Sequence, residues 1–157
     1  MPARILIVDD HEIVRQGIRN ILNRRPEWEV CGEAVNGKEG VEAVKRTEPD
    51  LVILDITMPV MNGLEATGHI SKLGVNSRVL IFTMHDSERL ISDVREAGAQ
   101  GYVLKSHAAR DLIVAIEKIL GGGTFFGSDQ SSQDKKKLER EPGSNLKFFA
   151  ALQFEFC

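Results

Sequence analysis

The chain has 157 residues, of which 27% are charged and 42% are hydrophobic, and its formal net charge is −3. This length and composition are typical of a soluble globular domain, and the slightly acidic charge balance argues against broad electrostatic binding to nucleic acid or membrane surfaces. The apolar runs are far shorter than the roughly 20 residues of a membrane span, so we expect no membrane association.

The N-terminus predicts no secretory signal, because no basic stretch is followed there by a long apolar segment and a cleavage site. The two cysteines, Cys31 and Cys157, have neither metal-ligand nor redox spacing. Unpaired thiols of this kind are typical of a reducing compartment. We therefore expect a cytoplasmic protein.

Short apolar runs alternate with helical patterns from the N-terminus to about residue 122. One segment, Trp28–Ala34, alternates between apolar and polar residues and is typical of an edge strand. The other runs are nearly uninterrupted, which is typical of strands that are buried on both faces. These buried runs are Ile5–Val8, Leu51–Leu54, Val79–Phe82 and Gly101–Leu104.

The segments between these runs show helical spacing of apolar residues, most clearly from Ile13 to Leu22 and from Leu112 to Leu120. Gly74, Gly98 and the triplet Gly121–Gly123 are predicted to end helices. Five strand–helix repeats thus fill residues 3–121. This alternation predicts an α/β fold with a five-stranded parallel sheet, helices on both faces and right-handed crossovers.

The C-terminal segment differs in kind from the rest. We expect one domain over residues 1–127 and a polar linker or tail over residues 128–157, which contains the run Lys135–Lys137. The tail ends in an aromatic stretch with four of the seven phenylalanines. Docking on a partner, exchange between chains, disorder and non-native sequence all stay open as explanations of this stretch.

Polar residues follow four of the five predicted strands. Asp9 and Asp10 come after the first strand, Asp55 after the third, Thr83 after the fourth and Lys105 after the fifth. The carboxyl ends of parallel strands meet at one edge of the sheet, where ligands bind in open α/β folds. We therefore expect these side chains to share one pocket.

Each of these residues alone has an ordinary structural explanation. Asp9 and Asp10 could cap the following helix, Asp55 could be a turn residue, and Lys105 could be a solvated lysine. Together, three carboxylates and one ammonium group leave a net charge of −2 in one pocket. Repulsion of this kind is relieved by a divalent cation, and carboxylate oxygens suit Mg²⁺, with Mn²⁺ as the alternative.

These residues and their surroundings resemble the receiver domain of bacterial two-component response regulators. The resemblance rests on the acidic pair, on LVILDITMPVMNG around Asp55, on VLIFTMHD around Thr83 and on AGAQGYVLKS around Lys105, and it covers residues 3 to about 122. TMHD and AGAQGYVLK resemble the NarL/LuxR (FixJ-like) branch. The resemblance implies a flavodoxin-like, doubly wound (βα)5 fold with strand order 2-1-3-4-5, the order that is general for such receivers.

The resemblance also implies the chemistry. Asp55 would be the nucleophile and phosphoacceptor for a phosphohistidine on a sensor histidine kinase or phosphotransfer protein. Asp10 and Asp55 would bind Mg²⁺ directly, Asp9 through water, and Thr57 through its backbone carbonyl. Lys105 would stabilise phosphoryl oxygens. Catalysis by such a weak nucleophile depends on alignment and charge stabilisation.

Further residues would transmit and tune the response. Thr83 would form a hydrogen bond to the phosphoryl group and, together with Tyr102, would change position on phosphorylation as the switch. The structural alternative is that Tyr102 is an ordinary half-buried tyrosine of the strand. Thr57 and His85 flank the phosphoryl site and would tune the lifetime of the phosphoryl group. The readout would be a shift of the face formed by Ser87–Ala97, the fifth strand and the last helix, leading to homodimerisation or transcriptional output.

Specific DNA binding by this chain is not expected. Only 30 residues follow residue 127, without a helix-turn-helix pattern, and a lone lysine run is more typical of a solvated linker. We expect a signalling phosphoprotein that catalyses only its own phosphorylation and dephosphorylation, rather than an enzyme. The alternatives are a degenerate receiver that acts only as an interaction module and an Asp-nucleophile phosphohydrolase, whose loop would carry a second acid where this chain has Thr57.

Overall fold

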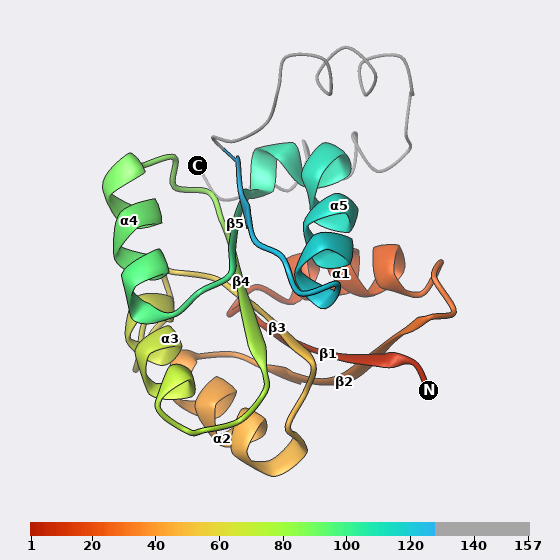
Figure 1. Cartoon of the computed structure of the whole chain (residues 1–157), viewed down its shortest axis with the longest axis horizontal. Coiled ribbons are helices and arrows are strands. Elements are labelled where there is room, and N and C mark those ends of the chain that lie inside the picture. The colour runs from red at the N-terminus through yellow and green to blue at the C-terminus, as the bar shows by residue number, and fades with distance from the viewer. Residues whose placement is uncertain (128–157) are drawn as a thin grey trace.

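The computed structural model of the chain describes residues 1–127 (Figure 1). The tail, with Cys157 and the lysine run, lies outside the described residues. Strands and helices alternate along the described chain, and a short 3₁₀ turn, Lys105–His107, precedes the last helix. The elements are β1 (Ala3–Val8), α1 (Glu12–Leu22), β2 (Trp28–Ala34), α2 (Gly37–Thr47), β3 (Leu51–Leu54), α3 (Gly63–Ser71), β4 (Arg78–Thr83), α4 (Glu88–Ala97), β5 (Gly101–Leu104), α5 (Ala108–Leu120) and β6 (Phe125–Phe126).

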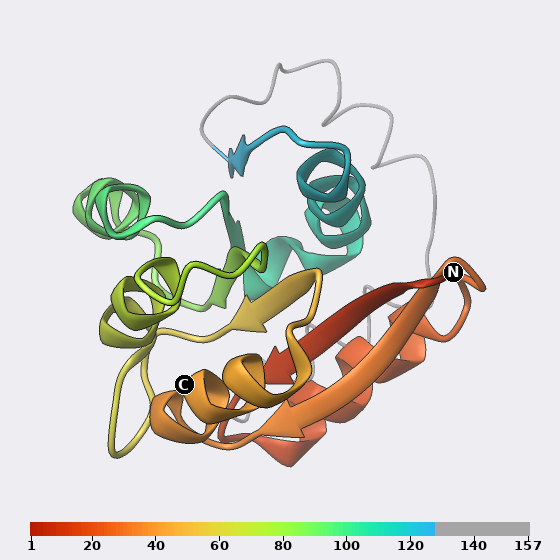
Figure 2. The ribbon, with the colours of Figure 1, turned by 60° about the horizontal axis from the view of Figure 1, so that its bottom comes forward.

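The strands form one parallel sheet with the order β2-β1-β3-β4-β5-β6 (Figure 2). The predicted order of the first five strands is therefore confirmed, and β2 lies at one edge, as its alternating sequence indicates. The sixth strand is a difference from the prediction. It pairs with β5 at the other edge, with Phe126 opposite Tyr102.

The helices cover both faces of the sheet and enclose two hydrophobic cores. On β1, Ile5 and Ile7 pack into the core under α1 and α5, whereas Leu6 and Val8 pack into the core under α2, α3 and α4. Figure 1 shows this division, with α1 and α5 together on one side of the sheet. Successive residues of a strand point to opposite faces, so an uninterrupted apolar run is what a doubly covered strand requires.

Two helix ends depend on glycine as the sequence predicts, and one differs. Gly98 ends α4 in the left-handed region, at φ +114°, and Gly122 follows α5 at φ +96°. α3 already ends at Ser71, before Gly74. Among residues 1–127, no helix is long and apolar enough to cross a membrane.

Candidate functional site

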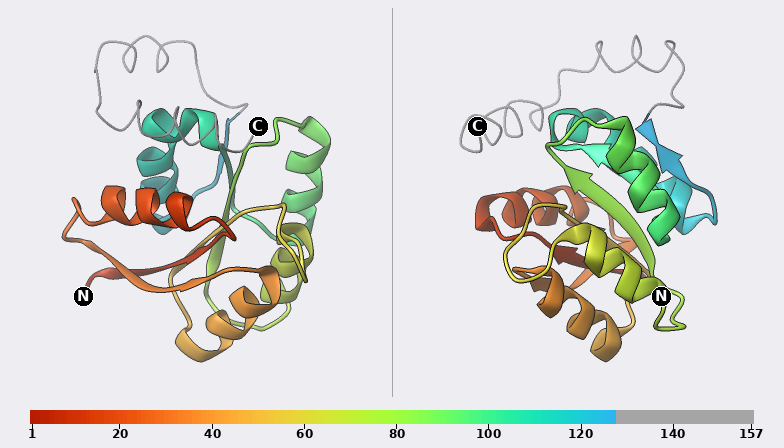
Figure 3. Two further views of the ribbon diagram at one scale, coloured as in Figure 1. Left: turned by 180° about the vertical axis from the view of Figure 1, so that it is seen from behind. Right: turned by 90° about the vertical axis from the view of Figure 1, so that its left-hand side faces the viewer.

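The carboxyl ends of the parallel strands β1, β3, β4 and β5 lie at one edge of the sheet (Figure 3). The predicted polar residues end or follow these strands. Asp9 is 2% exposed, and Asp55 and Lys105 are each 5% exposed. Thr83, the last residue of β4, is fully buried. Asp10 is the most exposed of the five. The strand order reverses between β1 and β3. Ligands bind in this fold at such a reversal, outside the carboxyl ends of the strands.

Lys105 joins the two buried carboxylates. Its Nζ lies 2.8 Å from Asp9 Oδ2 and 3.1 Å from Asp55 Oδ2. Burial alone would lower the pKa of Lys105, but the charges of Asp55 and Asp9 outweigh it and raise this pKa above its usual value. Lys105 is therefore a fixed positive charge between the two acids.

Asp55 is a carboxylate whose charged form is disfavoured by burial. Its pKa is raised, chiefly by burial and also by the charge of Asp9, and the charge of Lys105 offsets this only in part. One oxygen, Oδ1, accepts a hydrogen bond from the backbone N–H of Ile56 at 2.7 Å. The single lysine thus leaves negative charge in the pocket uncompensated.

The loop after β3 is packed so closely against Asp55 that it requires glycine at the start of α3. The N–H of Gly63 donates to the carbonyl of Ile56 at 2.7 Å. A Cβ on Gly63 would lie only 2.0 Å from the carbonyl oxygen of Asp55. The neighbouring cap, Asn62, accepts a hydrogen bond from the N–H of Glu65. These contacts hold the backbone that carries Asp55 against α3.

The donor set suits a hard divalent cation. Ligand atoms of Asp9, Asp10, His11 and Asp55 all lie within 4.8 Å of one another. Three carboxylates and one buried ammonium group need further positive charge, and oxygen donors are those that Mg²⁺ prefers. Sequence reasoning misses His11; its place directly after the acidic pair is the signal that could have found it.

Thr57 and His85 form a bridge beside the pocket. Thr57 Oγ1 lies 2.8 Å from His85 Nε2, although the two residues come from the loops after β3 and β4. The N–H of His85 donates to Thr83 Oγ1 at 3.4 Å. The structure thus brings together Thr57 and His85, from the loops that follow β3 and β4.

Tyr102 is buried rather than half-buried, at 2% exposure. Its hydroxyl donates a hydrogen bond to the backbone carbonyl of His85. Burial, with the charges of Asp86 and Asp55, raises the pKa of Tyr102 to about 12, so the hydroxyl stays protonated and can act as this donor. Tyr102 is thereby tied to the same loop that contacts Thr83 and Thr57.

The fold is that of a doubly wound α/β protein. Its acidic site, in which Lys105 contacts two carboxylates, lies where the strand order reverses. The chain belongs to the response regulator receiver domain family, whose family model matches residues 5–117. It is the receiver domain of a two-component response regulator, and the predicted resemblance and flavodoxin-like fold are confirmed.

Curated relatives come from the NarL/LuxR branch. The chain is 38% identical to the transcriptional regulatory protein DegU of Brevibacillus brevis over 78% of its own length and 52% of the relative. It is 36% identical to the nitrate/nitrite response regulator protein NarL of Escherichia coli K12, over 77% of this chain and 56% of the relative. The chain thus spans about half the length of these relatives. The match to the response regulator UvrY of the same strain covers 94% of this chain and 67% of UvrY, at 36% identity.

Solved structures agree with this assignment. A LuxR-family two-component response regulator from Aurantimonas sp. SI85-9A1 matches with a TM-score of 0.76 and 40% identity, over 88% of this chain and 96% of the other. The signal receiver domain of the putative response regulator NarL from Mycobacterium tuberculosis matches with a TM-score of 0.74 and 28% identity, over 77% and 98% of the two chains.

Proposed function

We propose that the chain is a phosphoryl-accepting switch that takes a phosphoryl group onto Asp55 from a phosphohistidine of a sensor histidine kinase or phosphotransfer protein. The observation that carries this proposal is the position of the Lys105 ammonium group, between the carboxylates of Asp9 and Asp55 in a buried pocket. A family assignment to receiver domains supports the same chemistry.

In the proposed transfer, an oxygen of Asp55 attacks phosphorus while the bond between phosphorus and the histidine nitrogen breaks, and the electron pair leaves with that nitrogen. The product is an acyl phosphate, which water later hydrolyses. Asp55 is a weak nucleophile, so the protein contributes alignment and charge stabilisation rather than acid–base chemistry. Lys105 supplies a fixed positive charge for a phosphoryl oxygen.

Asp10 and Asp55 would hold Mg²⁺ directly, with Asp9 through water and the backbone carbonyl of Thr57 as a further ligand; Mn²⁺ is the alternative ion. When bound, the ion supplies positive charge that neutralises phosphoryl oxygens. This role fits the uncompensated negative charge and the oxygen donors of the pocket.

Thr83 would donate its hydroxyl to the phosphoryl group, and Tyr102 would follow the movement of the loop after β4. The hydrogen bonds of His85 to Thr83 and Tyr102 support this coupling. Thr57 and His85, which bridge beside the pocket, would tune the lifetime of the phosphoryl group. The affected face would comprise α4, β5 and α5, with homodimerisation or transcriptional output as the consequence.

We further propose a cytoplasmic signalling phosphoprotein that catalyses only its own phosphorylation and dephosphorylation, without specific DNA binding by this chain. A phosphodonor assay tests the central proposal. Incubation with acetyl phosphate should add about 80 Da, one phosphoryl group, only when Mg²⁺ is present. Asp55→Asn should abolish this adduct. Repeated turnover of phosphoesters would favour a phosphohydrolase, and absence of any adduct would favour a degenerate interaction module.

A further inference from the structure

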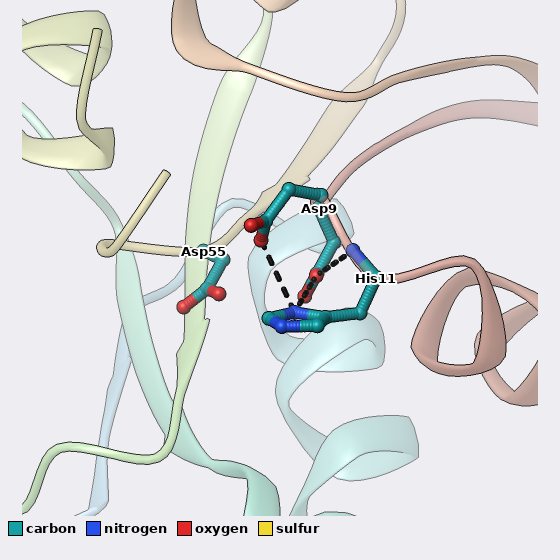
Figure 4. Close-up of side chains that lie close together, drawn as sticks. Asp9, His11 and Asp55 are labelled. Carbon is teal, nitrogen blue, oxygen red and sulfur yellow. Dashed lines mark hydrogen bonds and ion pairs between the residues drawn. The ribbon is translucent and has the colours of Figure 1, made fainter. Parts of the chain in front are cut away.

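His11 places an imidazole nitrogen among the acidic side chains of the pocket. Its Nδ1 lies 3.0 Å from Asp9 Oδ1 and 3.1 Å from Asp10 Oδ1. Figure 4 shows the ring of His11 next to Asp9 and near Asp55. A ring nitrogen of His11 belongs to the same group of ligand atoms, all within 4.8 Å of one another, as an oxygen of Asp55.

The position of His11 is not explained by helix capping. His11 is the N-cap residue of α1, but its side chain makes no capping hydrogen bond. Asp9 Oδ1 instead accepts from the backbone N–H of His11 at 2.9 Å, so the turn is held by Asp9 and by the backbone. The imidazole is 37% exposed, whereas the side chain of Asp9 beside it is 2% exposed, so the ring is open to solvent.

We propose that His11 is a nitrogen ligand of the pocket cation, and that it shifts the metal preference of the site toward late first-row transition ions such as Co²⁺ and Ni²⁺. This inference rests on the cation site of the proposed function and adds a ligand to it. Imidazole nitrogen binds these ions well, whereas Mg²⁺ favours oxygen and water. A site with three carboxylates and the His11 nitrogen should therefore favour Co²⁺ over Mg²⁺ more strongly than a site with the three carboxylates alone.

The test is calorimetric titration of the unphosphorylated full chain with MgCl₂ and, separately, with CoCl₂. His11→Ala should lower Co²⁺ affinity about tenfold or more, the usual cost of losing a group that supports a metal site, and should change Mg²⁺ affinity less than about twofold. In the proton NMR spectrum of the Co²⁺ form, a strongly shifted exchangeable imidazole N–H resonance should be present in the wild type and absent in His11→Ala.

His69→Ala is the matched control, because His69 is an exposed histidine on α3, away from the acidic pocket; it should leave both affinities unchanged. Equal effects of His11→Ala on both ions, or none on either, would overturn the inference. The proposed function fails separately: in that case the wild type would not bind Mg²⁺, or Asp10→Asn would leave Mg²⁺ binding unchanged.

Discussion

Asp55 is a buried acid whose raised pKa has a direct consequence for stability. A raised pKa means that the folded protein binds this proton more tightly than the unfolded chain does. The free energy of unfolding therefore falls as pH rises from the ordinary carboxyl range through the raised pKa of Asp55. Without metal, Asp55→Asn should stabilise the protein by on the order of 1 kcal/mol at pH 7, because it removes a charge that is buried and is also repelled by Asp9.

Urea unfolding in EDTA at pH 7 and at a pH below the ordinary carboxyl range measures this effect. The gain from Asp55→Asn should shrink toward zero at the lower pH, where Asp55 is protonated in both states. Glu96→Gln, at an exposed carboxylate on α4, should show no such gain. A loss of stability in Asp55→Asn at pH 7 would show that the ion pair with Lys105 outweighs burial and repulsion.

Val60 is a second residue that lowers the stability of the folded state, here through its backbone conformation. It lies in the loop between β3 and α3, is 77% exposed, and adopts φ +69°, a region that a β-branched residue rarely occupies. Val60→Gly should raise the free energy of unfolding by about 1 kcal/mol, since it removes this strain without removing a buried contact.

Thermal unfolding of Val60→Gly beside Val35→Gly tests this prediction. Val35 is also an exposed loop valine, 41% exposed, but its φ is not positive. Val35→Gly should therefore destabilise the protein, with backbone entropy contributing about 0.5–1 kcal/mol. If both glycine variants lose stability, the loop at residue 60 is not strained.

At the scale of elements, β6 ties the end of the described chain to β5 and α4. Phe125 and Phe126 are both buried, and Phe126 pairs with Tyr102 on β5. The guanidinium of Arg95, on α4, lies 4.1 Å from the centre of the Phe126 ring. Phe126→Ala should therefore destabilise the protein by about 3 kcal/mol, the lower range for a buried phenylalanine.

Chemical denaturation gives this value, with Val114→Ala as the control. Val114 is an exposed apolar residue on α5, and its truncation should change the free energy of unfolding by no more than about 0.5 kcal/mol. An equally small loss in Phe126→Ala would mean that β6 adds little to the folded state in solution.

The strands that were predicted and the strand that was missed differ in length and surroundings. The buried four-residue apolar runs predict β1, β3, β4 and β5 because strands covered on both faces need no polar residue. β6 has only two residues after a glycine triplet, so it lacks periodicity and exists only through its pairing with β5. Similarly, the positions of Asp9, Asp55 and Lys105 directly after strands predict that these residues share one pocket. The side-chain rotamer that brings His11 to the same pocket cannot be predicted in this way.

At the scale of the whole molecule, the two hydrophobic cores and the acidic pocket make opposite contributions to stability. The cores bury most residues of β1, β3, β4 and β5 on both sides of the sheet, and this burial supplies the free energy that holds Asp9 and Asp55 together against their repulsion. The pocket is thus preorganised by the fold, and a cation that relieves the repulsion must in turn stabilise the entire domain.

This linkage gives a prediction for Mg²⁺ itself. An ion that binds only the folded state at 100 times its dissociation constant adds about 2.7 kcal/mol, which corresponds to an increase in Tm on the order of 10 °C. Differential scanning calorimetry in EDTA and in MgCl₂ should show this increase for the wild type, whereas Asp10→Asn, which removes a proposed ligand, should lose most of it. Glu96→Gln should retain it. An equal increase in all three proteins would mean that Mg²⁺ acts by general screening rather than in the pocket.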